Sequence, residues 1–186
     1  MCSAVAGINV IAFDYWKERS WAVVEHDPLL SFETGILNEA FAVWCAHAES
    51  GTIPPRSALT ARDMKTFLGS VLIVERQDDG RYRVRLMGTK ITQVIGEMQG
   101  RIIEEALPPD AVARWRMGFD LVLSELRPMR FVSKVIVQDI RCLQAEILLA
   151  PLLDEAGRPN MVFGVAIFKT GENPETVMHE IPDERN

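Results

Sequence analysis

The sequence is poor in cysteine and histidine, the side chains from which most disulfide, redox and transition-metal sites are built. Its 186 residues include only three of each. The cysteines, Cys2, Cys45 and Cys142, are far apart, odd in number and without C-x-x-C spacing. We therefore expect reduced thiols in a cytoplasmic protein, with neither a disulfide framework nor a zinc site.

The sequence also lacks the common signatures of catalysis. His26, His47 and His179 form no metal-binding or catalytic set. No serine or cysteine lies in a nucleophile elbow, and no glycine-rich phosphate loop is present. We predict that the protein is not an enzyme, and that it has no catalytic residues and no metal site.

Basic residues are outnumbered by acidic ones, and long apolar runs are absent. The 20 Lys and Arg against 26 Asp and Glu give a formal net charge of −6, which argues against a nucleic-acid-binding surface. No stretch approaches the ~20 consecutive apolar residues of a membrane span. The apolar stretch 4–13 contains Asn9 and follows no basic residue, so a secretory signal is poorly supported.

What is present is sufficient for one buried core, because 48% of the 186 residues are hydrophobic. Residues 1–30 show no sustained period and are interpreted as a variable N-terminal arm. Residues 31–170 are interpreted as the domain, including an N-terminal helix. The remaining residues, 171–186, are rich in Glu, Asp and Pro and are predicted to be a flexible tail.

The clearest local pattern is the alternating run from Tyr82 to Thr89. Its period of two predicts a half-buried strand with Tyr82, Val84 and Leu86 on one face. Gly88 permits a backbone bend that a side chain would resist. Apolar residues then recur at helical spacing, so the strand is predicted to turn into a short helix at this glycine.

Periodicity also places the other segments. Residues 70–75 are an apolar run with β-branched members, and an Asp-Gly turn connects this predicted strand to the next one. A one-sided apolar stripe predicts a long helix that ends before Pro128. Three further extended runs should form an antiparallel meander. They span residues 129–138, 141–153 and 161–169.

An amphipathic helix is predicted from Glu33 to Glu49. Its apolar arc is wider than the narrow seam of a simple docked helix. We predict that part of this arc is shared with a second subunit in a homodimer, with Leu37, Phe41 and Trp44 at the interface. The alternative is that the whole arc docks on the core of its own chain.

The order of these elements and several motifs resemble the PAS fold, and in particular a bacterial PAS-like family formerly described as a domain of unknown function. The similar segments cover about Leu37 to Phe168. They are Tyr82-Arg83-Val84-Arg85-Leu86-x-Gly88-Thr89, Gly96-x-x-x-Gly100-Arg101, Ile53-Pro54-x-Arg56-Ser57, and Glu146-x-x-Leu149-x-Pro151-Leu152 with Gly157 and Gly164.

This resemblance implies an α+β fold with a five-stranded antiparallel sheet, short helices over one face and an amphipathic N-terminal helix. It also implies a non-catalytic sensory module, a stand-alone cytoplasmic regulator that binds a small ligand, a partner protein in signalling, or both. A flavin photoreceptor would carry a Gly-x-Asn-Cys-Arg-Phe signature, and a haem-binding domain would offer an axial histidine near the cavity. Both are missing, so the cofactor is unknown.

A sheet with helices over one face leaves a cavity that is filled either by side chains or by a ligand. Seven apolar residues are expected to face it and are candidate ligand contacts, although they fit a plain core equally well. They are Leu86, Ile91, Ile95, Trp115, Phe119, Val135 and Ile147.

Two charged residues of the central strand are candidates for polar contacts. Arg83 and Arg85 share a strand face, and a covered guanidinium needs a partner. The simple interpretation is an ion pair with Glu75 or Glu146 across the sheet. The alternative is a contact with an anion or a partner protein.

Two other functions remain open. A cone-shaped isomerase or dehydratase would need an acid at the cavity, and Asp120 is the only candidate on the long helix. A ligand-free interaction module would instead have a closed core.

Overall fold

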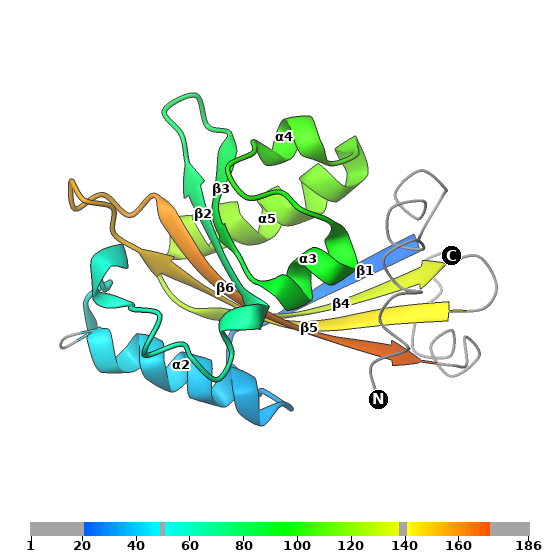
Figure 1. Cartoon of the computed structure of the whole chain (residues 1–186), viewed down its shortest axis with the longest axis horizontal. Helices are drawn as coiled ribbons and strands as arrows, with labels where there is room; N and C mark the ends of the chain where they lie inside the picture. Colours follow the sequence, from blue (N-terminus) through cyan, green and yellow to red (C-terminus); the bar gives the residue numbers. More distant parts are fainter. Residues whose placement is uncertain (1–20, 49–50, 138–140, 172–186) are drawn as a thin grey trace.

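The computed structural model describes residues 21–48, 51–137 and 141–171 (Figure 1). In these segments the strands are β1 (Trp21–Asp27), β2 (Val71–Arg76), β3 (Tyr82–Met87), β4 (Met129–Val137), β5 (Arg141–Leu152) and β6 (Met161–Gly171). The helices are α2 (Gly35–His47), α3 (Thr89–Ile95), α4 (Ile103–Ala106) and α5 (Pro109–Glu125), with short 3-10 helices η2 (Arg56–Ala58) and η3 (Leu68–Ser70). None of the described helices is long and apolar enough to cross a membrane.

The strands form one antiparallel sheet in the order β1-β4-β5-β6-β2-β3. The predicted α+β, PAS-like class is confirmed, but the described sheet has six strands instead of five. The additional strand is β1, which lies in the predicted arm and pairs with β4 along its whole length. Its seven residues carry no clean alternation, and the strand is specified by pairing with a partner that lies more than 100 residues away in the sequence.

Helices cover both faces of the sheet, because the predicted short helices lie over one face and the predicted N-terminal helix lies over the other. In Figure 1, α2 lies on one side of the sheet, and α3, α4 and α5 lie on the other. Successive residues of β5 contact opposite layers, since Leu148 belongs to the core beneath α2 and Leu149 to the core beneath α5. We call these two clusters the α2-side core and the α5-side core.

The α5-side core contains buried residues from β2, β3, α3, α5 and neighbouring elements. Its buried members are Leu72, Val74, Tyr82, Val84, Met87, Ile91, Met98, Ile103, Phe119, Val122, Leu123, Met129, Phe131, Leu149, Val162 and Ala166. The α2-side core is formed by Leu37, Ala40, Trp44, Leu59, Met64, Phe67, Val71, Ile73, Leu148, Ala150, Leu152, Met161, Phe163 and Val165.

A β-bulge in β3 corrects the predicted face of Leu86. Ile73 pairs with Leu86, but the next residue of β2, Val74, pairs with Val84, so Arg85 has no partner in this register. An extra residue in one strand reverses the alternation beyond it. Val84 therefore lies in the α5-side core, whereas Leu86 packs against the α2-side core.

The predicted turn from strand to helix at Gly88 is present, but its physical basis is different. Gly88 has φ −72° and ψ 150°, a conformation that any residue adopts. What requires glycine is space, because a Cβ at this position would lie about 2.4 Å from the backbone of Gly69. The Gly88 N–H also donates to the Val71 carbonyl at 2.7 Å, which fixes the two segments against each other.

We predict that Gly88→Ala destabilises the fold by about 2 kcal/mol or more, because the added methyl group meets backbone that cannot rotate away. Gly35→Ala is the matched control, since a Cβ there would have no neighbour within 4 Å. Chemical denaturation measures both. Equal midpoints for Gly88→Ala and the parent would show that the η3 segment moves freely and that the close approach is not a constraint.

Candidate ligand-binding site

The α5-side core brings together five of the seven residues predicted to contact a ligand. Ile91 and Phe119 are buried in it, and Ile95, Trp115 and Ile147 are partly exposed and pack against it. These residues come from α3, α5 and β5, which are far apart in the sequence. Five residues that were expected to face one cavity therefore do lie together in the structure.

One of the other two candidates lies elsewhere in the fold. Leu86 lies on the opposite face because of the bulge in β3. Val135 belongs to β4, where its backbone pairs with Ala22 and Leu143, and its side chain lies outside the described part of the chain.

Helix α5 approaches the sheet closely because two glycines face one leucine. A Cβ at Gly118 would lie 3.1 Å from Leu149 Cδ1, and a Cβ at Gly164 would lie 3.1 Å from Leu149 Cδ2. The Leu149 side chain therefore fills the space between α5 and β6. Little room for a ligand is left at this point.

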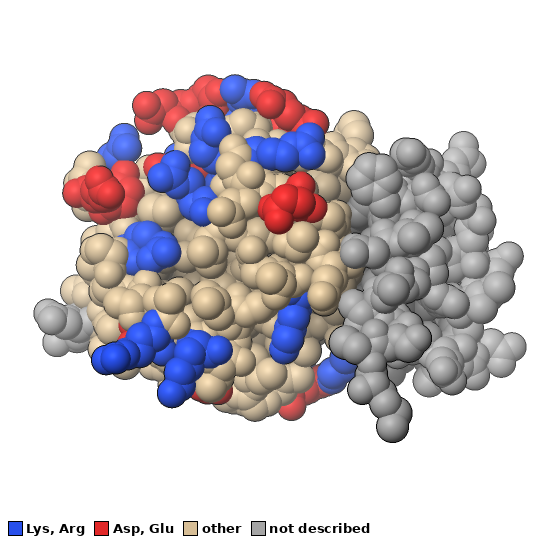
Figure 2. All heavy atoms as spheres, viewed as in Figure 1, with Lys and Arg blue, Asp and Glu red and all other residues tan. Residues whose placement is uncertain are grey.

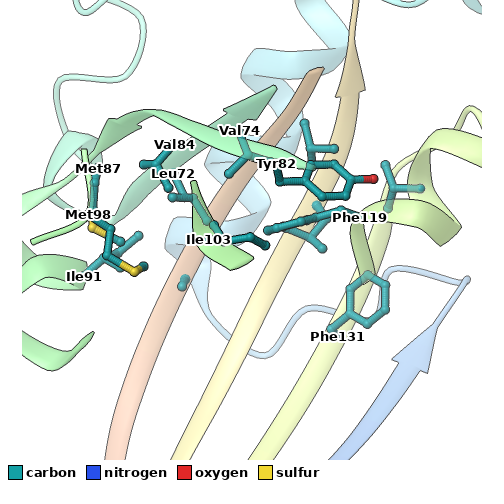
Figure 3. Close-up of a cluster of buried hydrophobic side chains, with 14 of the residues drawn as sticks. Leu72, Val74, Tyr82, Val84, Met87, Ile91, Met98, Ile103, Phe119 and Phe131 are labelled. Atoms are coloured by element: carbon teal, nitrogen blue, oxygen red, sulfur yellow. The ribbon is translucent and has the colours of Figure 1, made fainter. Parts of the chain in front are cut away.

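Two methionines lie in another part of the same core. Figure 3 shows Met87 and Met98 beside Ile91, away from the aromatic rings. All three side chains are buried. Methionine is unbranched and adapts to irregular spaces, so this region can rearrange at lower cost than the region around Leu149.

Three aromatic rings lie together in this core, and the hydroxyl of one of them makes a polar contact. Tyr82 and Phe119 have ring centroids 5.1 Å apart, and Phe119 meets Trp115 edge-on at 6.0 Å. The Tyr82 hydroxyl donates to Asp120 Oδ1 at 2.6 Å. Above the ring, the Arg116 guanidinium carbon lies 5.6 Å from the Tyr82 centroid.

Acidic groups hold this arrangement in place. Glu104 accepts a hydrogen bond from Arg116 at 2.8 Å and another from the Tyr82 backbone N–H at 3.1 Å.

Burial raises the pKa of the Tyr82 hydroxyl well above its ordinary value, and the hydrogen bond to Asp120 and the negative charge of Asp120 raise this pKa further. The hydroxyl is therefore a neutral donor. This role of Tyr82 was not predicted, since local periodicity carries no information about a partner 38 residues away.

The two arginines of β3 have different kinds of partner, and Arg85 makes one of the predicted ion pairs. Arg85 is largely exposed and pairs with Glu75 at 3.5 Å, one of the two predicted carboxylates. Arg83 donates to the Gly100 carbonyl at 2.9 Å. The second predicted carboxylate, Glu146, is instead bound by Arg130 on β4.

Two of the three predicted interface residues of α2 are buried by their own chain. Leu37 has no exposed surface and Trp44 is 8% exposed. The Trp44 indole donates to the Pro151 carbonyl at 2.9 Å, which ties the helix to the end of β5. Phe41 is partly exposed and lies 6.0 Å from the Phe32 ring. Most of the apolar arc therefore serves the α2-side core, as the alternative interpretation stated.

Charged groups are distributed unevenly over the surface drawn in Figure 2. Lys, Arg, Asp and Glu lie mainly around the margin of this face, and its middle consists of other residues. Among the described residues on this face, the basic side chains form separate groups and no continuous track. Within the described segments, no group of three or more His, Cys, Asp or Glu could hold a metal ion.

A family model for the PAS domain matches residues 34–167. The chain belongs to the PAS domain family. The match begins at the residue before α2 and ends within β6, so β1 lies outside it.

Among curated proteins, no match was found. Among solved structures, an RNA-binding light-oxygen-voltage receptor is similar over 80% of this chain and 38% of its own length, with a TM-score of 0.37 and 13% identity. The chain thus spans less than half of that receptor.

We predict that Tyr82→Phe makes the protein less sensitive to alkali. A pKa that is higher in the folded than in the unfolded state contributes stability below the unfolded value of about 10, and this contribution is lost as the pH rises above it. The parent should therefore lose stability more steeply than Tyr82→Phe between about pH 9.5 and 11.5.

Denaturation midpoints measured across this range give the slope. Asp120→Asn, which keeps an acceptor but removes the charge, should have an intermediate slope. Identical slopes for parent and Tyr82→Phe would contradict the assignment of the buried hydroxyl.

Proposed function

We propose that this PAS domain is a non-catalytic sensory module that binds a small molecule in the α5-side core and passes the signal to a partner protein as a cytoplasmic regulator. The observation that carries the proposal is the meeting of Ile91, Ile95, Trp115, Phe119 and Ile147 at one core. Apolar walls with a few polar groups are typical of small-molecule sites.

The chemistry of this core indicates the kind of ligand. Its walls are aliphatic and aromatic, and Tyr82 supplies a hydroxyl that already has an acceptor in Asp120. A mainly apolar molecule with one hydrogen-bonding group fits these walls. The adaptable side chains of Met87 and Met98 favour entry beside them, since the Leu149 side chain between Gly118 and Gly164 leaves little room around itself.

Asp120 gives little support to the alternative of an isomerase or dehydratase. Its carboxylate accepts the Tyr82 hydroxyl and lies 3.8 Å from Arg116 Nε. Its side chain is 44% exposed, so the group lies at the boundary of the core and not within it. A carboxylate that is solvated and already paired is a weak candidate for a general base.

The proposal predicts that Phe119→Trp weakens or abolishes binding of any molecule that co-purifies, because the larger ring occupies space in the core. Native mass spectrometry of freshly purified protein identifies the bound species and its occupancy. Phe41→Trp is the matched control, since the same aromatic enlargement is then made on the far side of the sheet. Unchanged occupancy in Phe119→Trp would place the ligand elsewhere.

Homodimer formation is proposed for the exposed part of α2. Because Leu37 and Trp44 are used within the chain, only Phe41 among the three predicted residues is available for contact. Phe41→Glu should shift the protein toward monomer, since it would place an unpaired charge in an interface. Light scattering measures the mass, and a monomeric parent at micromolar concentration would contradict the dimer.

A further inference from the structure

A buried carboxylate on β5 connects elements that are distant in the sequence. Glu146 is 4% exposed. Its Oε1 accepts the Arg130 Nε–H at 2.8 Å and the Glu33 backbone N–H at 2.7 Å, and its Oε2 accepts the Thr34 hydroxyl at 3.0 Å. Thr34 is the residue that precedes the first turn of α2. One carboxylate therefore holds the start of this helix against the sheet.

The arginine of the same pair reaches the neighbouring edge strand. Arg130 is 9% exposed, and its Nη1 lies 3.6 Å from Asp27 Oδ2 at the end of β1. Its Nη2 donates to Glu33 Oε1 at 3.2 Å. Asp27 in turn accepts the backbone N–H groups of Leu29 and Ser31 at 2.8 and 2.9 Å, so it also orders the connection to α2.

The charges at this place are mutually dependent. Three carboxylates, Asp27, Glu33 and Glu146, surround Arg130, and Lys169 lies 3.6 Å from Glu33. Removing Glu146 or Arg130 leaves the other charge buried without its main partner, and an unpaired buried charge is strongly destabilising. Breaking one of these contacts is therefore expected to weaken the other contacts of Arg130 and Glu146.

The family match begins at Thr34, so β1 and the connection to α2 lie outside the matched domain. We propose that Glu146 and Arg130 form a single latch for both N-terminal elements, so that the end of β1 and the first turn of α2 are released together when the latch opens. The remainder of α2 stays docked through Ala40 and Trp44. The latch thus defines a unit that can move without unfolding the layer of α3, α4 and α5.

Hydrogen exchange of the full chain tests this coupling. In Glu146→Gln, the amides at the Asp27 end of β1 and those of Leu37 and Asn38, which bond to the Thr34 carbonyl, should exchange about tenfold faster than in the parent. Amides of α5 should keep the parent rate. Glu75→Gln is the matched control, because Glu75 is also a strand carboxylate paired with an arginine but contacts neither N-terminal element. It should leave both elements unchanged.

A second variant covers the case in which Glu146→Gln does not fold. Thr34→Val removes only the hydroxyl donor at α2, which bonds Glu146 and not β1. Faster exchange at the Asp27 end of β1 in this variant would therefore demonstrate the coupling directly. Faster exchange confined to α2 would overturn the proposal. A uniform increase that includes α5 would also overturn it, since the pair would then support the whole fold and not a local unit.

Discussion

The ion pair of Glu146 and Arg130 constrains the positions of four elements at once. Transferring each charge from water into the protein costs on the order of several kcal/mol, and the mutual attraction offsets this cost only when the remaining hydrogen bonds are satisfied. Here both carboxylate oxygens are occupied. Burial tends to raise the pKa of Glu146, but hydrogen bonds from Glu33, Arg130 and Thr34 and the arginine charge outweigh it and hold the pKa below its ordinary value. The carboxylate therefore remains charged near neutral pH.

The value of this pair lies more in specificity than in net stability. Val132 is opposite Glu146 in the β4–β5 ladder, and Phe131 is opposite Ile147. A slip of either strand by one residue would turn a charged side chain toward the α5-side core and an apolar one toward the latch. The correct register is thus the only one in which the charges meet. This register also sets which residues of β5 face the candidate ligand-binding site, because Ile147 follows Glu146 directly.

Local patterns in the sequence were sufficient for the elements whose causes are local. The α2 and α5 stripes, the hairpin between β2 and β3 and the change from strand to helix at Gly88 were all predicted from periodicity and turn residues. The features that were missed have causes distant in the sequence. Strand β1 depends on β4, the face of Leu86 depends on a bulge against β2, and the burial of Trp44 depends on a carbonyl of β5. No window of neighbouring residues contains that information.

The same distinction applies to the candidate site. Apolar residue type correctly grouped five of its residues, since a core selects for hydrophobicity from every element that faces it. The polar contacts were not predictable, because Tyr82, Glu104, Arg116 and Asp120 acquire their partners only when β3, α4 and α5 are packed together.

These contacts give the α5-side core two different kinds of boundary. At the aromatic end, the Tyr82 hydroxyl is fixed by a hydrogen bond, and the Arg116 side chain covers the Tyr82 ring. At the other end, Met87 and Met98 provide walls without directional contacts. The side chains of this core are therefore held by directional contacts at the aromatic end and are more adaptable at the methionine end.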